Sequence, residues 1–309
     1  MSIGAPLEFT GERFTPECVR EIWYEHWHRY ALVQPWAQGR RVLDAACGEG
    51  YGSAVLAQSA AAVLGLDIDP AAVAHARARY AALANLRYEQ ADATRLQLPA
   101  GGFDLVVSFE TLEHVEAQDA LLDGLSHALA DDGLLVISSP DKATYSDAAG
   151  FRNEYHVREL YRDEFEQLLR RRFPYVRLYA QRLLFQSAIW SLDPPDPQGA
   201  GHYATADGDG GVEQGLHYAP MYFIAVCSRQ PLPPLPASSW FGDRDETVYR
   251  HYNHEIRQNM AAGGRIAELE AQLAALQREH AVLAAGVAAP AAATATATPW
   301  WRRWLAARR

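Results

Sequence analysis

The chain has 309 residues, of which 49% are hydrophobic, and 28 basic against 38 acidic residues give it a net charge of −10. A chain of this size can bury a full core, while its acidic balance argues against a general nucleic-acid-binding protein. No stretch approaches the roughly 20 apolar residues of a spanning helix, and the start shows no secretory signal, so we expect a cytoplasmic protein. Cys18, Cys47 and Cys227 lack metal-ligand spacing, which predicts neither a disulfide framework nor a zinc site.

Residues 1–36 are predicted to form a helical segment ahead of the first strand. The stretch "GERFTPECVREIWYEHWHRYALVQPW" is dense in aromatic and ionic side chains. In one interpretation it is a helical cap whose Trp23, Trp27 and Tyr30 cover an edge of a sheet. A second interpretation, in which this segment reaches a ligand, stays open.

Residues 37–228 alternate short apolar runs with helical patterns. The runs "RRVLDAA", "AAVLGLDI", "FDLVVSF" and "GLLVIS" are separated by patterns such as "AAVAHARARYAALA" and "AQDALLDGLSHALA". Strands and helices that alternate at this spacing indicate a parallel sheet covered by helices, which is the α/β fold class.

The ends of the first three strands carry a glycine-rich loop and three acidic residues. Gly48 and Gly50 follow a strand that ends at Asp44, and glycines at that point let a ligand approach the main chain closely. Asp67 ends the second strand, where a carboxylate suits a ribose diol, and Asp92 closes the third. Because successive strand ends lie along one edge of a parallel sheet, we expect an acidic ligand-binding edge.

Together these motifs resemble a class I S-adenosylmethionine-dependent methyltransferase. "LDAACGEGYG" resembles the first motif of that family, "GLDIDP" its ribose-binding motif, "QADAT" its adenine-contacting motif, and "FDLVVSFETLEHV" its fourth strand and following turn. The one departure is Ala46, where the motif most often has a glycine. A nicotinamide-dependent enzyme would share the glycine loop and the ribose-binding acid, but not the adenine-contacting acid or the turn "FETLEHV".

The resemblance covers roughly residues 41–140 and implies both a fold and a cofactor. The fold is a Rossmann-like, seven-stranded, mostly parallel sheet whose last hairpin, "YVRLYAQRLLF" with "APMYFIAVCS", is antiparallel. The cofactor is S-adenosylmethionine, with Asp67 at the ribose, Asp92 at the adenine and the glycine loop at the methionine portion. The N-terminal segment resembles the lids of sugar-modifying methyltransferases, in which an arginine or tyrosine reaches the cofactor carboxylate. The residues expected at the cofactor are Arg13, Arg29, Tyr30, Asp44, Ala45, Gly48, Gly50, Asp67, Ile68, Asp92, Ala93 and Glu110.

Two histidines are the candidates for catalysis. His114 follows the fourth strand in "ETLEHV", and His156 lies in "NEYHV" after the fifth strand. An imidazole can accept a hydroxyl proton during methyl transfer, although a structural or cofactor-positioning role for His114 stays open. The segment around His156 resembles methyltransferases associated with bacterial surface polysaccharide (O-antigen) synthesis. By that resemblance, the residues that line the acceptor pocket are Asp141, Lys142, Tyr145, Arg152 and Asn153.

The C-terminal part differs in composition from the rest. We expect a linker over 229–262, a short coiled-coil helix over 263–285, and a low-complexity linker with a Trp/Arg-rich tail over 286–309. The helix seam predicts a homo-oligomer, with a single helix docked on its own domain as the alternative. The tail is typical of an interfacial membrane anchor, with docking onto a partner protein as the alternative. The seam residues follow steps of three and four: Ile266, Leu269, Leu273, Leu276 and Leu283.

The sequence therefore predicts a methyltransferase that modifies a sugar hydroxyl or a terminal phosphate of a surface glycan. We expect peripheral contact with the inner membrane face, a glycosyltransferase partner, no nucleic-acid partner and no metal site. A small-molecule methyltransferase for a lipid, quinone or natural product is one alternative. A scaffold that recruits a glycosyltransferase is another.

Overall fold

The computed structural model describes residues 21–189, 203–206, 208 and 211–287. The chain divides into two compact units, 1–245 and 246–309. Arg13 and the Trp/Arg-rich tail, for which the sequence predicts cofactor and membrane contacts, lie outside the described residues.

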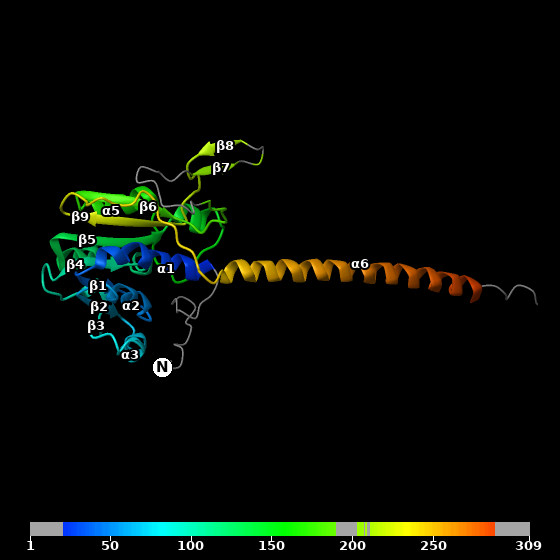
Figure 1. Cartoon of the computed structure of the whole chain (residues 1–309), viewed down its shortest axis with the longest axis horizontal. Coiled ribbons are helices and arrows are strands. Elements are labelled where there is room, and N and C mark those ends of the chain that lie inside the picture. The colour runs from blue at the N-terminus through cyan, green and yellow to red at the C-terminus, as the bar shows by residue number, and fades with distance from the viewer. Residues whose placement is uncertain (1–20, 190–202, 207, 209–210, 288–309) are drawn as a thin grey trace, which may run out of the picture. The chain divides into compact units, whose positions relative to one another are not determined.

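The first unit is built on a seven-stranded sheet with the order β3-β2-β1-β4-β5-β9-β6 (Figure 1). The first five strands are parallel, and β9 lies antiparallel between β5 and β6. This confirms the predicted parallel sheet and its antiparallel hairpin. The strands are β1 (Arg41–Ala45), β2 (Ala62–Asp67), β3 (Leu86–Gln90), β4 (Phe103–Ser108), β5 (Leu129–Pro140), β6 (Tyr175–Gln181) and β9 (Tyr222–Ser228); β7 (Ala204–Ala206) and β8 (Val212–Gln214) form a separate antiparallel pair.

Helices cover both faces of the sheet, and each face has its own buried apolar cluster. Strand β1 contributes to both, since Val42 faces one cluster and Leu43 the other, as the alternation of a strand requires. The first cluster packs α1 (Glu21–Val33), η1 (Gln34–Ala37), α2 (Tyr51–Ala57) and α3 (Pro70–Arg79); the second packs η3 (Leu112–His114), α4 (Gln118–Ala128) and α5 (Arg162–Arg170). Two further short helical turns are η2 (Ala93–Arg95) and η4 (Ala143–Asp147).

Helix α1 crosses the edge of the sheet where the parallel strands end. Its Trp23 and Trp27 pack against the first apolar cluster, as the predicted cap requires. Its next turn reaches the strand ends themselves, because Tyr30 donates to Asp44 at the end of β1 and Arg29 donates to Gln181 at the end of β6. The helix therefore covers the strand edge and also brings polar side chains to it.

The segment predicted as a linker from residue 229 begins as a packed strap. Leu232 and Leu235 pack against the first apolar cluster, and the Tyr179 hydroxyl donates to the Pro236 carbonyl at 2.8 Å. The Phe241 ring stacks on His28 with centroids 5.6 Å apart and contacts Trp23 at 5.5 Å. Residues 229–241 thus belong to the first unit, and their proline-rich composition reflects an extended path along its surface.

The second unit contains one long helix, α6 (Thr247–Val287), of 41 residues. It begins well before residue 263, so the predicted helix start is wrong. Polar residues interrupt the apolar pattern between Thr247 and Met260, and this concealed the helix from a reading by periodicity. The seam residues are exposed, from 46% at Leu269 to 62% at Leu276 and Leu283. Within the described ranges, none of the helices is both long enough and apolar enough to cross a bilayer.

Candidate active site

The loop between β1 and α2 turns sharply through left-handed backbone conformations. Gly48 and Gly50 have φ values of 57° and 92°, and Ala46, the departure from the family motif, adopts 62°. A Cβ on Gly50 would lie 2.7 Å from the Tyr88 ring, whose hydroxyl donates to the Gly50 carbonyl at 2.7 Å. Glycine is therefore required at residue 50 both by conformation and by space.

Asp44 lies beneath this loop and is completely buried, as is its neighbour Ala45. Its carboxylate accepts from the Ser53 hydroxyl at 2.6 Å and from the Tyr30 hydroxyl at 3.2 Å. Burial raises the pKa of the Asp44 carboxyl to about 7. The hydroxyl of Tyr30, which the sequence predicts as a candidate contact of the cofactor carboxylate, thus donates to Asp44 in the structure.

Asp67, at the end of β2, joins the glycine loop to the next helix. Its two oxygens accept from the backbone N–H groups of Gly48 at 2.8 Å and Asp69 at 2.9 Å. A carboxylate offers about four lone-pair sites, so two acceptor sites remain for a ligand hydroxyl. Ile68, the next residue, exposes 64% of its surface and supplies an apolar face beside this carboxylate.

Asp92 follows β3 at the same edge of the sheet. Its Oδ1 accepts from the Thr94 backbone N–H at 2.9 Å and from the Thr94 hydroxyl at 2.6 Å, which caps the turn that begins at Ala93. These two hydrogen bonds lower the pKa of the Asp92 carboxyl, and the bond from the Thr94 hydroxyl has the larger effect. The structure therefore holds an ionised carboxylate at the third strand end, where the sequence predicts an adenine contact.

Arg29 is the largest polar side chain in the interior of the unit, with an exposed fraction of 1%. Its Nε donates to Gln181 Oε1 at 2.7 Å, and its guanidinium carbon lies 4.5 Å from the centre of the Tyr222 ring. One terminal nitrogen is 3.5 Å from Glu110 Oε1. Among the described residues, neither terminal nitrogen has a hydrogen-bond partner. A buried guanidinium in this state can bind an incoming carboxylate through its fork.

Glu110 follows β4 and turns the chain back with a positive φ of 50°. Its Oε1 accepts from the Ser138 hydroxyl at 2.6 Å, and the same Ser138 oxygen accepts from the Glu110 N–H at 3.0 Å. Ser138 lies on the neighbouring strand β5, so this pair fixes the turn where β4 leaves the sheet. Glu110 is thereby held beside Arg29.

The two predicted catalytic histidines lie together, although 42 positions separate His114 and His156 in the chain. Their ring centroids are 4.9 Å apart, and the Tyr145 ring stacks on His156 at 5.2 Å. Glu113, which precedes His114 in η3, is fully buried. Burial, followed by the negative charge of Glu110, raises the pKa of the Glu113 carboxyl.

The predicted acceptor-pocket residues fall into two groups. Asp141 and Asn153 are buried and cap turns, since their carboxylate and amide oxygens accept from the backbone N–H groups of Ala143 and Tyr155. The Lys142 ammonium lies over the Tyr161 ring, 4.8 Å from its centre. Tyr145 contacts His156, and Arg152 is exposed on the same loop.

Several residues of this edge were not predicted from the sequence. Glu49, inside the glycine loop, is fully buried and bonds His75, Arg79 and Tyr80, which anchors the loop to α3. Gln181 and Tyr222 reach Arg29 from the last two strands of the sheet. Their contact with a helix near the N-terminus could have been predicted only from the order of the strands in the sheet.

Comparison with known proteins identifies the domain. Residues 43–137 match the family described as "Methyltransferase domain". The chain contains a class I methyltransferase domain. S-Adenosylmethionine is the cofactor of such domains, and the matched residues include the glycine loop and all three acidic strand ends.

The methyltransferase domain has relatives among curated bacterial proteins. A "probable S-adenosylmethionine-dependent methyltransferase" of Mycobacterium tuberculosis is 37% identical over 168 residues, which cover 53% of this chain and 60% of the relative. A relative of the same description from Mycolicibacterium smegmatis is 35% identical, covering 54% of this chain and 65% of the relative. The chain thus spans less than two thirds of the length of these relatives.

Among solved structures, the YcgJ protein of Bacillus subtilis is similar to this chain. It is 17% identical with a TM-score of 0.48, covering 67% of this chain and 100% of that one.

A further curated relative matches a shorter stretch of the sequence. This trans-aconitate 2-methyltransferase of Methylobacterium nodulans is 36% identical over 109 residues, which cover 35% of this chain and 41% of the relative.

Proposed function

We propose that the protein binds S-adenosylmethionine at the carboxyl edge of the sheet and transfers its methyl group to an oxygen acceptor. The observation that carries the proposal is Arg29, a buried guanidinium whose two terminal nitrogens lack hydrogen-bond partners among the described residues. The amino-acid end of the cofactor carries the carboxylate that such a fork binds. When bound, the cofactor would supply a methyl carbon on a positively charged sulfur. That sulfur would leave with the bonding electron pair as the acceptor oxygen bonds to the carbon, and a hydroxyl acceptor would pass its proton to solvent, whereas an ionised phosphate would have none to lose.

Each strand end then has a role toward the cofactor. Asp67 accepts from ribose hydroxyls through its remaining lone pairs, with Ile68 against the adenine. Asp92 accepts from the adenine amino group. The Gly48–Gly50 backbone, braced by buried Asp44, holds the methionine portion. Positioning and exclusion of water supply much of the rate enhancement in such a reaction, because the methyl carbon is already activated.

The acceptor is a hydroxyl or a terminal phosphate of a surface glycan. In support, the loop after β5 that carries His156 exposes two aromatic side chains, Phe151 and Tyr155, and aromatic rings offer flat apolar faces on which a sugar ring can pack. One relative is named for a small acid, trans-aconitate, so a small-molecule acceptor is the second candidate. A non-catalytic scaffold that recruits a glycosyltransferase is a third candidate function. The complete set of polar residues at the carboxyl edge of the sheet argues against it.

The second unit serves assembly in this proposal. The exposed seam of α6 binds second copies of the chain, and the Trp/Arg-rich tail, outside the described residues, attaches the assembly to the inner membrane face. Several tails on one assembly bind more tightly than one, because each further contact is made at high effective concentration.

The decisive experiment combines calorimetry with a transfer assay. Titration with S-adenosylmethionine tests the cofactor site, and incubation with methyl-labelled cofactor and panels of glycan, phosphoglycan and small-acid acceptors tests the acceptor class. Absence of cofactor binding would refute the proposal. Binding with label transfer only to small acids would replace the glycan assignment by the second candidate.

A further inference from the structure

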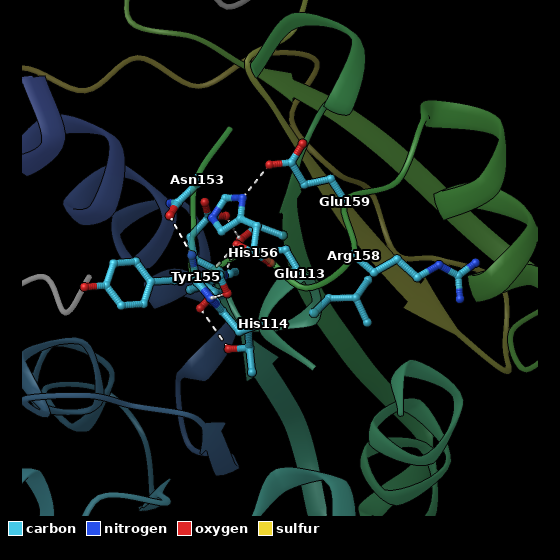
Figure 2. Close-up of polar contacts among 12 residues, drawn as sticks. Glu113, His114, Asn153, Tyr155, His156, Arg158 and Glu159 are labelled. Atoms are coloured by element: carbon cyan, nitrogen blue, oxygen red, sulfur yellow. Dashed lines mark hydrogen bonds and ion pairs between the residues drawn. The ribbon is translucent and has the colours of Figure 1, made fainter. Parts of the chain in front are cut away.

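Three side chains of metal-ligating type meet where the chain leaves β4. Glu113 and His114 belong to η3, and His156 comes from the loop after β5 (Figure 2). One possible ligand atom from each of the three lies within 4.8 Å of the others. Two imidazoles and one carboxylate at this separation can converge on a single ion.

Of the three side chains, Glu113 has the greatest need of a cationic partner. Its side chain is fully buried, and among the described residues neither carboxylate oxygen has a hydrogen-bond partner. Nε2 of His114 lies 3.9 Å from its Oε1. A buried carboxylate without hydrogen bonds is costly unless a cation balances it. A metal ion between these groups would satisfy both oxygens.

Both histidines are oriented by a hydrogen bond at Nδ1. His114 Nδ1 lies 3.0 Å from the Tyr155 carbonyl oxygen, and His156 Nδ1 lies 2.6 Å from Glu159 Oε1. An acceptor at Nδ1 favours the tautomer with its proton there and the lone pair on Nε2. Metal-binding histidines almost always have an outer partner of this kind, either a carbonyl or a carboxylate.

The two segments that carry these ligands are joined through their main chains. The Glu113 carbonyl accepts from the N–H groups of Val157 and Arg158 at 2.8 and 3.0 Å. The Gln118 amide donates to the carbonyls of Leu112 and Arg158, both at 2.9 Å. The two main-chain segments that carry the ligands are therefore fixed relative to one another, and a functional metal site requires such support.

We propose that Glu113, His114 and His156 bind one divalent first-row transition metal ion. Imidazole ligands suit Zn²⁺, Mn²⁺, Fe²⁺ or Co²⁺ better than Mg²⁺ or Ca²⁺, which prefer all-oxygen sites. Three protein ligands leave positions open for ligand oxygens, as in catalytic zinc sites. The site thus selects an acceptor with two neighbouring oxygens, such as a vicinal diol.

The part of this ion in catalysis rests on the function proposed above. A metal-bound hydroxyl loses its proton more readily, and the proton passes to solvent. Coordinated imidazoles have no lone pair left for that proton, so this assignment replaces the histidine base expected from the sequence. The proposal departs from the sequence-based expectation of no metal site. The three residues come from two distant segments of the chain, and only the fold brings them together.

The test measures metal binding directly, without cofactor or acceptor. Full-length, tag-free protein is stripped with a chelator and dialysed against Zn²⁺, Mn²⁺, Co²⁺ or Mg²⁺, and bound metal is counted by plasma mass spectrometry. We expect one equivalent of a transition metal and no stoichiometric Mg²⁺. Glu113→Gln and His156→Gln should each abolish stoichiometric binding, while Glu159→Gln should weaken it about 10- to 100-fold. His127→Gln, an exposed histidine on α4, is the matched control and should bind like the wild type.

Circular dichroism establishes that each variant is folded, and Glu113→Gln preserves side-chain shape. Failure of the wild type to bind any of the transition metals, or full binding by both folded ligand variants, would overturn the site. Methyl transfer that persists unchanged in chelator would overturn its catalytic part while leaving the proposed function standing. Metal binding without any cofactor binding would refute the proposed function and leave the metal site standing.

Discussion

Arg29 on α1 and Gln181 at the end of β6 are joined by a buried hydrogen bond of 2.7 Å, which spans the carboxyl edge of the sheet. The Gln181 amide in turn donates to the Glu25 carbonyl of the same helix at 2.9 Å. These two bonds fix the guanidinium while leaving its terminal nitrogens without hydrogen-bond partners among the described residues. The helix thus holds a fixed cation at this edge of the sheet, in addition to covering it.

Arg29→Met is therefore expected to weaken S-adenosylmethionine binding by about 10- to 100-fold, because hydrogen bonds to charged groups contribute about 1.5–3 kcal/mol. The measurement is isothermal titration. Methylthioadenosine, which has the nucleoside but no amino-acid carboxylate, is the control ligand. Its affinity should be equal for wild type and variant. An equal loss for both ligands would show that Arg29 supports the fold of the site and does not bind the carboxylate.

Asp67→Asn tests the second strand end. The asparagine amide would point its own N–H group at the backbone N–H of either Gly48 or Asp69, so that two donors would face each other. The side chain would also have fewer acceptor sites for the ribose hydroxyls. We expect about 10-fold or greater loss of cofactor affinity in titration and a lower melting temperature of the free protein. The matched control is Asp69→Ala, which removes an N-cap of α3 and should reduce stability by about 1 kcal/mol with little effect on affinity. Unchanged affinity in Asp67→Asn would exclude the ribose role.

The acidic residues at the strand ends were predictable, because the alternation of strands and helices is visible in the sequence and each acid lies at the end of a predicted strand. Each acid needed only the rule that parallel strands end at one edge. The surroundings of Arg29 were not predictable in this way. Gln181 and Tyr222 are more than 150 positions away, and they meet Arg29 only because β6 and β9 lie at the end of the sheet order.

Glu113 shows a second limit of the sequence. In "ETLEHV" it looks like one of two ordinary acidic residues, and periodicity gives no sign that one is fully buried. Its burial follows from the main-chain contacts of η3 with residues 157 and 158, which belong to a loop without regular pattern. Helix α6 shows the opposite case, since its apolar seam was visible but its polar first half concealed where it begins.

Asp44 makes the stability of the free protein depend on pH. The unfolded chain releases this proton near a pKa of about 3.9, whereas the buried carboxyl holds it until about pH 7. Between these values the folded state binds more protons, so the free energy of unfolding falls as pH rises, by at most about 1.4 kcal/mol per pH unit. Above about pH 8 this contribution no longer changes.

The comparison that isolates this group is wild type against Asp44→Asn, by urea unfolding from pH 4.5 to 8.5. We expect the wild type to lose stability relative to the variant up to about pH 7, and the two curves to run parallel above it. Parallel curves over the whole range would mean that Asp44 is ionised in the folded protein throughout.

The last prediction concerns the exposed seam of α6. Leu273 and Leu276 lie on one side of the helix and are 56% and 62% exposed, a state that association with second copies would relieve. Leu273→Gln combined with Leu276→Gln should move the full-length protein to a smaller mass class in light scattering. Cofactor affinity should be retained, because the ligand edge lies entirely in the first unit.

Val282 provides the control, since it is 72% exposed and, at 100° per residue, lies on the opposite side of the same helix. Val282→Gln removes a similar apolar side chain without touching the seam, so its mass class should be that of the wild type. If assembly also concentrates the tails, the double variant should sediment less with anionic vesicles than the wild type and Val282→Gln do. A wild type that is already monomeric, or a double variant that keeps the wild-type mass, would remove the seam as the site of assembly.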